Sequence, residues 1–226
     1  MNMSNELSKP PAPFRVGGKS PFGLAARKQA AALATNTPIE IQPHEMEHRI
    51  GIVFDDSGSM GTAQIADAKA GVEEFLRSCE KDKTAVAIYP MNMEGIPLCS
   101  NLPAVAVYAQ GISATDGTPL VLTANTMLNQ NKLTRAIIFS DGSPTGDRDI
   151  EKLIAHGVSI DCVYIPDMYV DASAEQFMQE LARKTDGIYL RFERGKSNFR
   201  AAFKYLSPGL RYMLADKSFV SKLEGR

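Results

Sequence analysis

Three oxygen-bearing side chains, Asp55, Ser57 and Ser59, alternate along one short segment of the sequence. They follow directly on the apolar run Ile50–Phe54, and glycines lie between and after them. Carboxylate and hydroxyl oxygens are hard ligands, which suit a magnesium-type ion better than zinc or copper. The residue types and their spacing therefore predict a site for a hard divalent cation.

The segment around these residues has the pattern of a strand, a polar loop and a helix. The run Ile50–Phe54 predicts a buried strand, and after Gly61 apolar residues recur at helical spacing up to Cys79. Open α/β sheets place their sites at the carboxyl ends of parallel strands. We therefore expect the Asp55 loop to lie at such an end.

The rest of the chain continues this alternation. Further strands are predicted at Thr84–Tyr89, within Leu98–Tyr108, and at Arg135–Ser140, Val158–Ile165 and Ile188–Phe192. Helices are predicted from 120 to about 129, around Ile150–Ile154, from the capping-box spacing Ser173-x-x-Gln176 onward, and over Phe199–Leu206. The pattern predicts an α/β fold with a doubly wound, mostly parallel, six-stranded sheet and helices on both faces. If the strand order is 3-2-1-4-5-6, Asp55 and Asp141 follow the two strands at the switch point and share one crevice.

The pattern Asp55-x-Ser57-x-Ser59 after a hydrophobic strand resembles the metal-ion-dependent adhesion site of von Willebrand factor A (vWA) domains. Two further pieces of the family pattern follow in the same order. Gly117-Thr118-Pro119-Leu120 is similar to the Gly-Thr loop of the family, and Ile137–Gly142 is similar to its second strand with an aspartate. The passage Phe177–Tyr189, which ends in Thr185-Asp186-Gly187-Ile188-Tyr189, is similar to the last helix-to-strand passage of the family. The resemblance covers roughly Arg49–Leu206 and is to the intracellular type of vWA domain, with its Rossmann-like fold.

The resemblance implies a role for each of five residues. Ser57, Ser59 and Thr118 would give hydroxyl oxygens to Mg²⁺, or to Mn²⁺ or Ca²⁺. Asp55 and Asp141 would act mostly through water and by holding the hydroxyls. Neutral ligands leave the charge of the ion uncompensated, so its open position favours an Asp or Glu of another protein. One departure from the family pattern is an acid at position 116, where a second glycine is common.

This reading predicts a metal-dependent protein-binding module and not an enzyme. The expected role is that of an adaptor in a multiprotein assembly linked to an AAA+ ATPase, with a MoxR-like ATPase as the partner that the family analogy suggests. One alternative is a structural or assembly protein that uses the fold as an interaction scaffold. An enzymatic alternative is a phosphatase of the haloacid-dehalogenase type, but such enzymes need a second aspartate where this chain has Ser57. The motif His44-Glu45-x-x-His48 imitates a zinc protease, yet Pro43 and the following strand leave no room for its helix.

The domain organisation predicted is an N-terminal extension over 1–48 with a short helix at Phe22–Leu33, a vWA domain over 49–206 and a basic tail over 207–226. Met1–Pro13 is polar and proline-rich, so we expect no secretory signal there; the sequence has no apolar run long enough to span a membrane, and its three cysteines are scattered. We therefore expect a cytoplasmic protein without a membrane partner. Residues 183–226 carry eleven Lys or Arg against four Asp or Glu, a net charge of +7. That segment is either a solvated helix face with a basic tail or a docking surface for acids, and nucleic acid is not the expected partner.

Overall fold

The computed structural model describes residues 42–80, 82–115, 117–142, 144–166, 171–192, 199–215 and 220. Its centre is one six-stranded sheet in the order β3-β2-β1-β4-β5-β6, as predicted. The strands are β1 (His48–Phe54), β2 (Thr84–Pro90), β3 (Ile96–Cys99), β4 (Arg135–Ser140), β5 (Ser159–Tyr164) and β6 (Tyr189–Arg191). Neighbouring strands run parallel except at β2–β3, which pair antiparallel. The predicted fold class is therefore confirmed.

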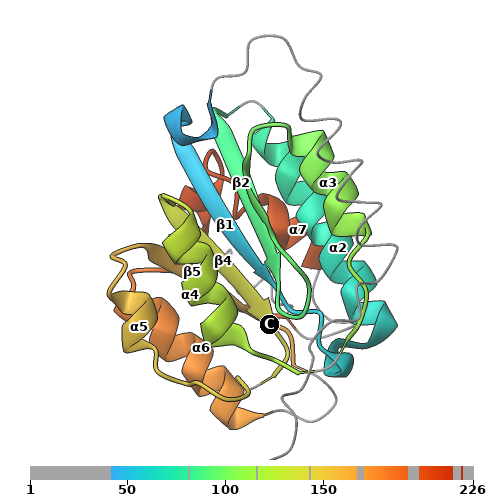
Figure 1. The fold of residues 1–226 in the computed structure, drawn as a ribbon, viewed down its shortest axis with the longest axis vertical. Coiled ribbons are helices and arrows are strands. Elements are labelled where there is room, and N and C mark those ends of the chain that lie inside the picture. Colours follow the sequence, from blue (N-terminus) through green and yellow to red (C-terminus); the bar gives the residue numbers. More distant parts are fainter. Residues whose placement is uncertain are drawn as a thin grey trace, which may run out of the picture.

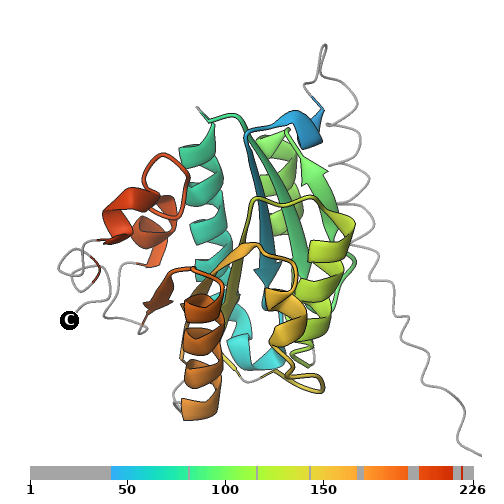
Figure 2. The same ribbon diagram turned by 90° about the vertical axis from the view of Figure 1, so that its left-hand side faces the viewer.

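Helices cover both faces of this sheet (Figure 1). They are α2 (Gly61–Cys79), α3 (Leu102–Gln110), α4 (Leu120–Gln130), α5 (Glu151–Ile154), α6 (Ala172–Lys184) and α7 (Phe199–Lys204), with short 3-10 helices η1 (Pro43–Glu45), η2 (Gly58–Met60) and η3 (Arg211–Ala215). Figure 2 shows α2 and α7 on one side of the central strands and α4 and α5 on the other. Among the described helices, none combines the length and the apolar character that a membrane span requires.

Two apolar cores lie on the two faces of the sheet. Strand β1 contributes to both, because Ile52 and Phe54 pack toward α2, α3 and α7 while Val53 packs toward α4 and α6. All three side chains are fully buried, which is why this strand has a continuous apolar sequence rather than an alternating one. The Phe54 and Phe139 rings meet edge to face, with centroids 4.6 Å apart. The strand that leads to the proposed site is thus held rigidly from both sides.

The strand expected within Leu98–Tyr108 was placed wrongly. The structure has a short edge strand at Ile96–Cys99 and then the helix α3 over Leu102–Gln110. Asn101 caps this helix, since its side chain accepts a hydrogen bond from the backbone N–H of Ala104 at 3.1 Å. Pro103 fits the first helical turn, where the missing N–H is not needed. Pro97 therefore lies on the edge strand itself, whereas Pro103 belongs to the start of α3.

A second local prediction was wrong at the start of α6. The capping residue is Asp171 rather than Ser173, because the Asp171 Oδ1 atom accepts from the backbone N–H groups of Ser173 and Ala174 at 2.9 and 3.3 Å. The absence of a zinc-binding helix at the His-Glu-x-x-His motif agrees with expectation, since His44 lies in η1 and His48 begins β1. The helix expected at Phe22–Leu33 lies outside the described residues.

A buried ion cluster ties the C-terminal segment to the sheet. Asp161 on β5 is fully buried and pairs with Arg135 on β4 and with Arg211 on η3, each at 2.8 Å. Arg135 also donates to the backbone carbonyl of Leu206. Leu206 and Leu214 are themselves buried. The described part of the C-terminal segment therefore packs on the domain through both charge and apolar contact.

Candidate metal centre

Four of the five predicted site residues, Asp55, Ser57, Ser59 and Asp141, follow the carboxyl ends of the two central strands. Strands β1 and β4 pair in parallel with Phe54 opposite Phe139, so the residues that follow them are neighbours. The Ser140 hydroxyl donates a short hydrogen bond to the Asp55 carboxylate, which joins the two strand ends directly. Both side chains are fully buried. The switch point of the sheet and the chemistry-bearing loops therefore coincide, as expected from the strand order.

A chain of hydrogen bonds connects three of the predicted ligands. The hydroxyl oxygens of Ser57 and Ser59 lie 3.0 Å apart, and Ser59 Oγ donates to Asp141 Oδ1 at 3.0 Å. Ser57 and Asp141 are buried, whereas Ser59 is exposed. Three oxygen-bearing side chains thus converge at one point that solvent reaches through Ser59.

Asp55 lies beneath this chain and orients the loop. Its Oδ1 atom accepts a hydrogen bond from the backbone N–H of Ser57 at 2.9 Å, and its Oδ2 atom accepts from Ser140. Burial raises the pKa of the Asp55 carboxyl group, and these hydrogen bonds oppose that rise because they favour the charged form. Asp55 therefore forms the base of the site and fixes the position of Ser57.

Thr118 is the predicted ligand that the hydrogen bonds do not connect to the others. Within the described part of the chain, no hydrogen bond joins its side chain to Asp55, Ser57, Ser59 or Asp141. Its backbone N–H donates to Thr145 Oγ1 at 3.0 Å, and its carbonyl accepts from the Thr145 N–H at 2.8 Å. Position 116, the departure from the family pattern, lies outside the described residues.

A second buried acid, Asp56, connects the Asp55 loop to two neighbouring loops. Its Oδ1 atom accepts from both the backbone N–H and the side-chain amide of Asn92, each at 3.0 Å. Its backbone carbonyl accepts from the Thr115 N–H at 2.7 Å. Burial raises the pKa of the Asp56 carboxyl group, and the hydrogen bonds from Asn92 oppose the rise. Asp56 thus binds the ends of β1 and β2 and the loop before α4 together.

These residues fit a hard cation. The donors are hydroxyl and carboxylate oxygens, and two of the buried acids, Asp55 and Asp56, form no ion pair with a described basic residue. A bound cation would compensate carboxylates whose burial otherwise disfavours their charge. Among the described residues, no group of three or more His, Cys, Asp or Glu is placed to hold a metal ion, so acidic side chains alone do not form the site. The donor set is therefore of the magnesium type and depends on hydroxyl groups.

The sequence predictions missed several residues that shape this site. Ser140 precedes the predicted Asp141, and Asp56 follows the predicted Asp55, so proximity to the motif was an available signal. Asn92 follows the carboxyl end of β2, the strand next to β1, which is also a site-prone position. No sequence pattern indicated Thr145, because its loop meets Thr118 only in the folded structure.

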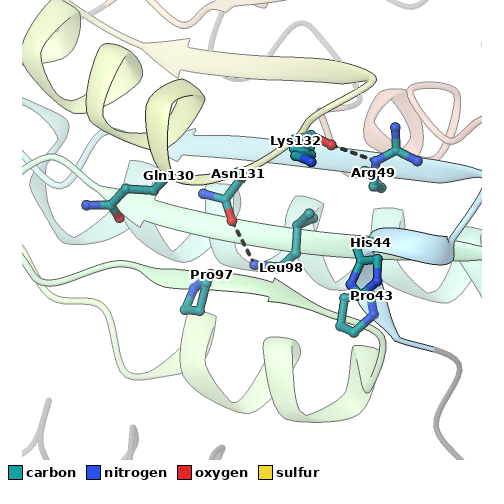
Figure 3. Close-up of a pocket in the computed structure, with 8 residues that line it drawn as sticks. All are labelled: Pro43, His44, Arg49, Pro97, Leu98, Gln130, Asn131 and Lys132. Carbon is teal, nitrogen blue, oxygen red and sulfur yellow. Dashed lines mark hydrogen bonds between the residues drawn. The ribbon is translucent and has the colours of Figure 1, made fainter.

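A pocket lies at the opposite end of the sheet (Figure 3). It encloses about 640 Å³ and is lined by Pro43, His44, Arg49, Pro97, Leu98, Gln130, Asn131 and Lys132. Arg49 is near the start of β1, whereas Asp55 follows its end. Figure 3 shows Asn131 pointing toward Leu98, to whose N–H its Oδ1 atom binds at 3.0 Å. This pocket is separate from the Asp55 site.

Comparison with known proteins places the fold but not the family. No family model and no curated protein sequence matches the chain. Among solved structures, the vWF domain of the type V pili tip protein Mfa5 from Porphyromonas gingivalis superimposes with a TM-score of 0.52 at 11% identity, over 75% of this chain and 96% of that one. The pilus adhesin SpaC from Lactobacillus rhamnosus GG, in its open conformation, gives a TM-score of 0.51 at 15% identity, over 78% of this chain but only 30% of SpaC. The chain therefore has a vWA-like fold.

Proposed function

We propose that this protein is a metal-dependent binding module that captures an acidic side chain of a partner protein at the Asp55 site. The observation that carries the proposal is the hydrogen-bonded chain Ser57–Ser59–Asp141 at the carboxyl edge of β1 and β4. It gathers hard oxygen donors from two loops 82 residues apart, with an exposed hydroxyl at its outer end. Beside this chain lie the buried acids Asp55 and Asp56, which form no ion pair with a described basic residue, and hydrogen bonding alone would not require them there.

The residues of the site have two different roles, as ligands of the ion and as groups that hold those ligands. Ser57 and Ser59 present hydroxyl oxygens, and Thr118 completes this set from the facing loop. Asp55 and Asp141 hold the hydroxyls and supply negative charge beneath them. A bound Mg²⁺, Mn²⁺ or Ca²⁺ ion would supply a positive charge with an open coordination position, which attracts a carboxylate. The three histidines of the sequence, His44, His48 and His156, lie outside this arrangement, so none of its hydroxyls has a histidine as base, which favours binding over catalysis.

The partner is proposed to be a protein that presents Asp or Glu. The two structural neighbours are a pilus adhesin and a pilus tip protein, which supports a role in protein binding for a fold of this kind. For this chain we propose, on the family analogy, an adaptor in an assembly with a MoxR-like AAA+ ATPase. We propose the cytoplasm as its compartment because Cys79 and Cys162 are buried thiols without a disulfide. Phe192 and Phe203 are buried in the core, so these aromatic rings of the basic segment cannot stack on nucleic acid bases.

Titration calorimetry with Mg²⁺ and Mn²⁺ tests the site directly. Wild type is expected to bind one ion, and Ser59→Ala is expected to bind it at least about tenfold more weakly, because a contact residue of the ion is lost. Ser59 is exposed, so the variant keeps its fold. The matched control is Ser78→Ala on α2, whose hydroxyl bonds only to the Glu74 carbonyl at 2.9 Å. Equal affinity in wild type and Ser59→Ala, or no binding by wild type, would refute the proposal.

The partner is tested by binding a purified MoxR-like ATPase to immobilised wild type and to Ser59→Ala in Mg²⁺ and in EDTA. Metal-dependent binding to wild type alone supports the adaptor role. Metal-independent self-assembly, measured by analytical ultracentrifugation, would favour the alternative of a structural scaffold. The observation that favours this second candidate is a groove of about 480 Å³ in which Leu122, with 64% of its surface accessible, lies with Met91 and Met93.

A further inference from the structure

The Asp56–Asn92 pair lies beside the proposed metal ligands without belonging to them. Asp56 is fully buried, whereas Asn92 is exposed. The Asn92 side-chain amide donates to Asp56 Oδ1 at 3.0 Å and to the Gly117 carbonyl at 2.9 Å. One exposed amide therefore bridges the Asp55 loop and the residue directly before Thr118.

Rotation at Gly117 sets the direction of Thr118. Gly117 has φ of +82°, a left-handed conformation that residues with a side chain rarely adopt. Because a glycine has wide conformational freedom, a small change in the Gly117 dihedral angles would reorient Thr118, the residue that follows it. The bond from Asn92 to the Gly117 carbonyl removes that freedom on one side of Thr118. On the other side, the two hydrogen bonds with Thr145 hold the Thr118 backbone.

Resting on the proposed function, we infer that Asn92, anchored by Asp56, is a positioning residue that fixes the Thr118 hydroxyl for the metal ion. Asn92 does not touch the ion in this role. It acts on the ligand that no hydrogen bond ties to the others. Thr118 is only 6% exposed, so its loop is already packed against the domain. The Asn92 amide therefore needs to select only the orientation of the Thr118 side chain. Loss of the bridge should therefore weaken metal binding without unfolding the domain.

Asn131 provides a matched control elsewhere in the fold. Its side chain also bridges separate segments, since it accepts from Leu98 N–H at 3.0 Å and donates to the Met127 carbonyl at 2.9 Å and to Tyr89 Oη at 3.1 Å. It lies at the far end of the sheet, in the pocket of Figure 3. Asn131 is buried and Asn92 is exposed, so the control substitution should cost more stability.

The experiment compares Asn92→Ala and Asn131→Ala by Mg²⁺ calorimetry and by thermal unfolding. Asn92→Ala is expected to bind Mg²⁺ roughly 10- to 100-fold more weakly with little change in melting temperature, as for other residues that orient metal ligands. Asn131→Ala is expected to melt earlier but to bind Mg²⁺ as wild type does. Equal Mg²⁺ affinity in wild type and Asn92→Ala would overturn the inference while leaving the proposed function standing.

A readout without metal separates the two proposals further. The Thr118 amide donates to Thr145 Oγ1, so its hydrogen exchange reports on the order of this loop. In metal-free buffer, Asn92→Ala should speed exchange at Thr118 and leave the β1 amides unchanged. Unchanged exchange at Thr118 would overturn the positioning role. Failure of wild type to bind Mg²⁺ would refute the proposed function, whatever the exchange result.

Discussion

Ser59 Oγ donates a 3.0 Å hydrogen bond to Asp141 Oδ1, although the two residues are 82 positions apart in the chain. The bond crosses from the loop after β1 to the loop after β4. Since these strands are neighbours in the sheet, the contact is a direct result of the strand order. The same two loops are joined at their base by Ser140, which donates to Asp55, the residue changed in the first prediction.

Magnesium is expected to stabilise wild type and not Asp55→Asn. An ion that binds only the folded state adds about 2.7 kcal/mol to the free energy of unfolding at a hundredfold excess over its Kd. Asparagine can accept from the Ser57 N–H and donate to Ser140, so in metal-free buffer the variant should stay within about 1 kcal/mol of wild type. Urea unfolding with and without Mg²⁺ measures both. A variant stabilised by Mg²⁺ as much as wild type would place the ion elsewhere.

Removal of the buried Asp161 carboxylate should strongly destabilise the fold. Asp161→Ala leaves Arg135 without its charge partner, with only about 10% of the Arg135 side chain exposed. Loss of one member of a buried ion pair costs about 3–5 kcal/mol. The control is Asp147→Ala, which breaks an exposed pair with Lys152 and should change the free energy of unfolding little. Similar urea midpoints for the two variants would contradict the prediction.

The Cys79 thiol should resist alkylation in the folded protein. Burial raises the pKa of this thiol to about 12, so it stays neutral at pH 8 while the half-buried Cys99 remains accessible. The expected result is slow modification of Cys79 until the protein is unfolded, measured by mass spectrometry of labelled peptides. Labelling of Cys79 at the rate of Cys99 in native buffer would show that this core opens readily.

The same thiol predicts the alkaline pH dependence of stability. Above its ordinary pKa of 9.0 the thiol of the unfolded chain loses its proton, whereas the folded chain keeps it up to about pH 12. The folded state then binds more protons, so the free energy of unfolding falls as pH rises between these values. Cys79→Ala should show a shallower fall in urea titrations at pH 9 to 11. Parallel slopes in the two proteins would assign the loss to other groups.

Gly187 should not tolerate a side chain. A Cβ atom there would lie 1.9 Å from the Ile160 carbonyl oxygen, a backbone atom that cannot move aside. Gly187→Ala is expected to destabilise the domain by about 3 kcal/mol or to prevent its soluble expression. Gly142→Ala is the control, because no atom lies within 4 Å of its added Cβ. Thermal unfolding of the two variants decides the point.

The sheet could be predicted because its signals are local. Apolar runs such as Ile50–Phe54 mark strands buried on both faces, and the alternation with helices limits the possible topologies. Leu102–Tyr108, the later part of the predicted strand range, was misassigned because Pro103 fits both an edge strand and the first turn of a helix. The feature that starts the helix is the Asn101 cap. It could not be recognised in the sequence, because many asparagines do not cap a helix.

The site could be predicted only to the level of residue types. Spacing in the motif placed Asp55, Ser57 and Ser59 together, and the strand order brought Asp141 to them. Which way Thr118 faces depends on backbone angles at Gly117 and on bonds from loops distant in sequence. The hydrogen bond from the Asn92 amide to the Gly117 carbonyl is an example, because the residues around Asn92 in the sequence do not indicate it.

The reversed edge strand β3 has a consequence for how this protein assembles into larger structures. It has four residues, and one of them, Pro97, has no N–H to donate. At the opposite edge β6 has only three residues. Both edge strands are therefore poor templates for pairing with a strand of another chain, which is the route by which exposed sheets join into fibrils. Higher-order complexes are expected to form through side chains at the loop end of the domain, not through continuous sheets shared between chains.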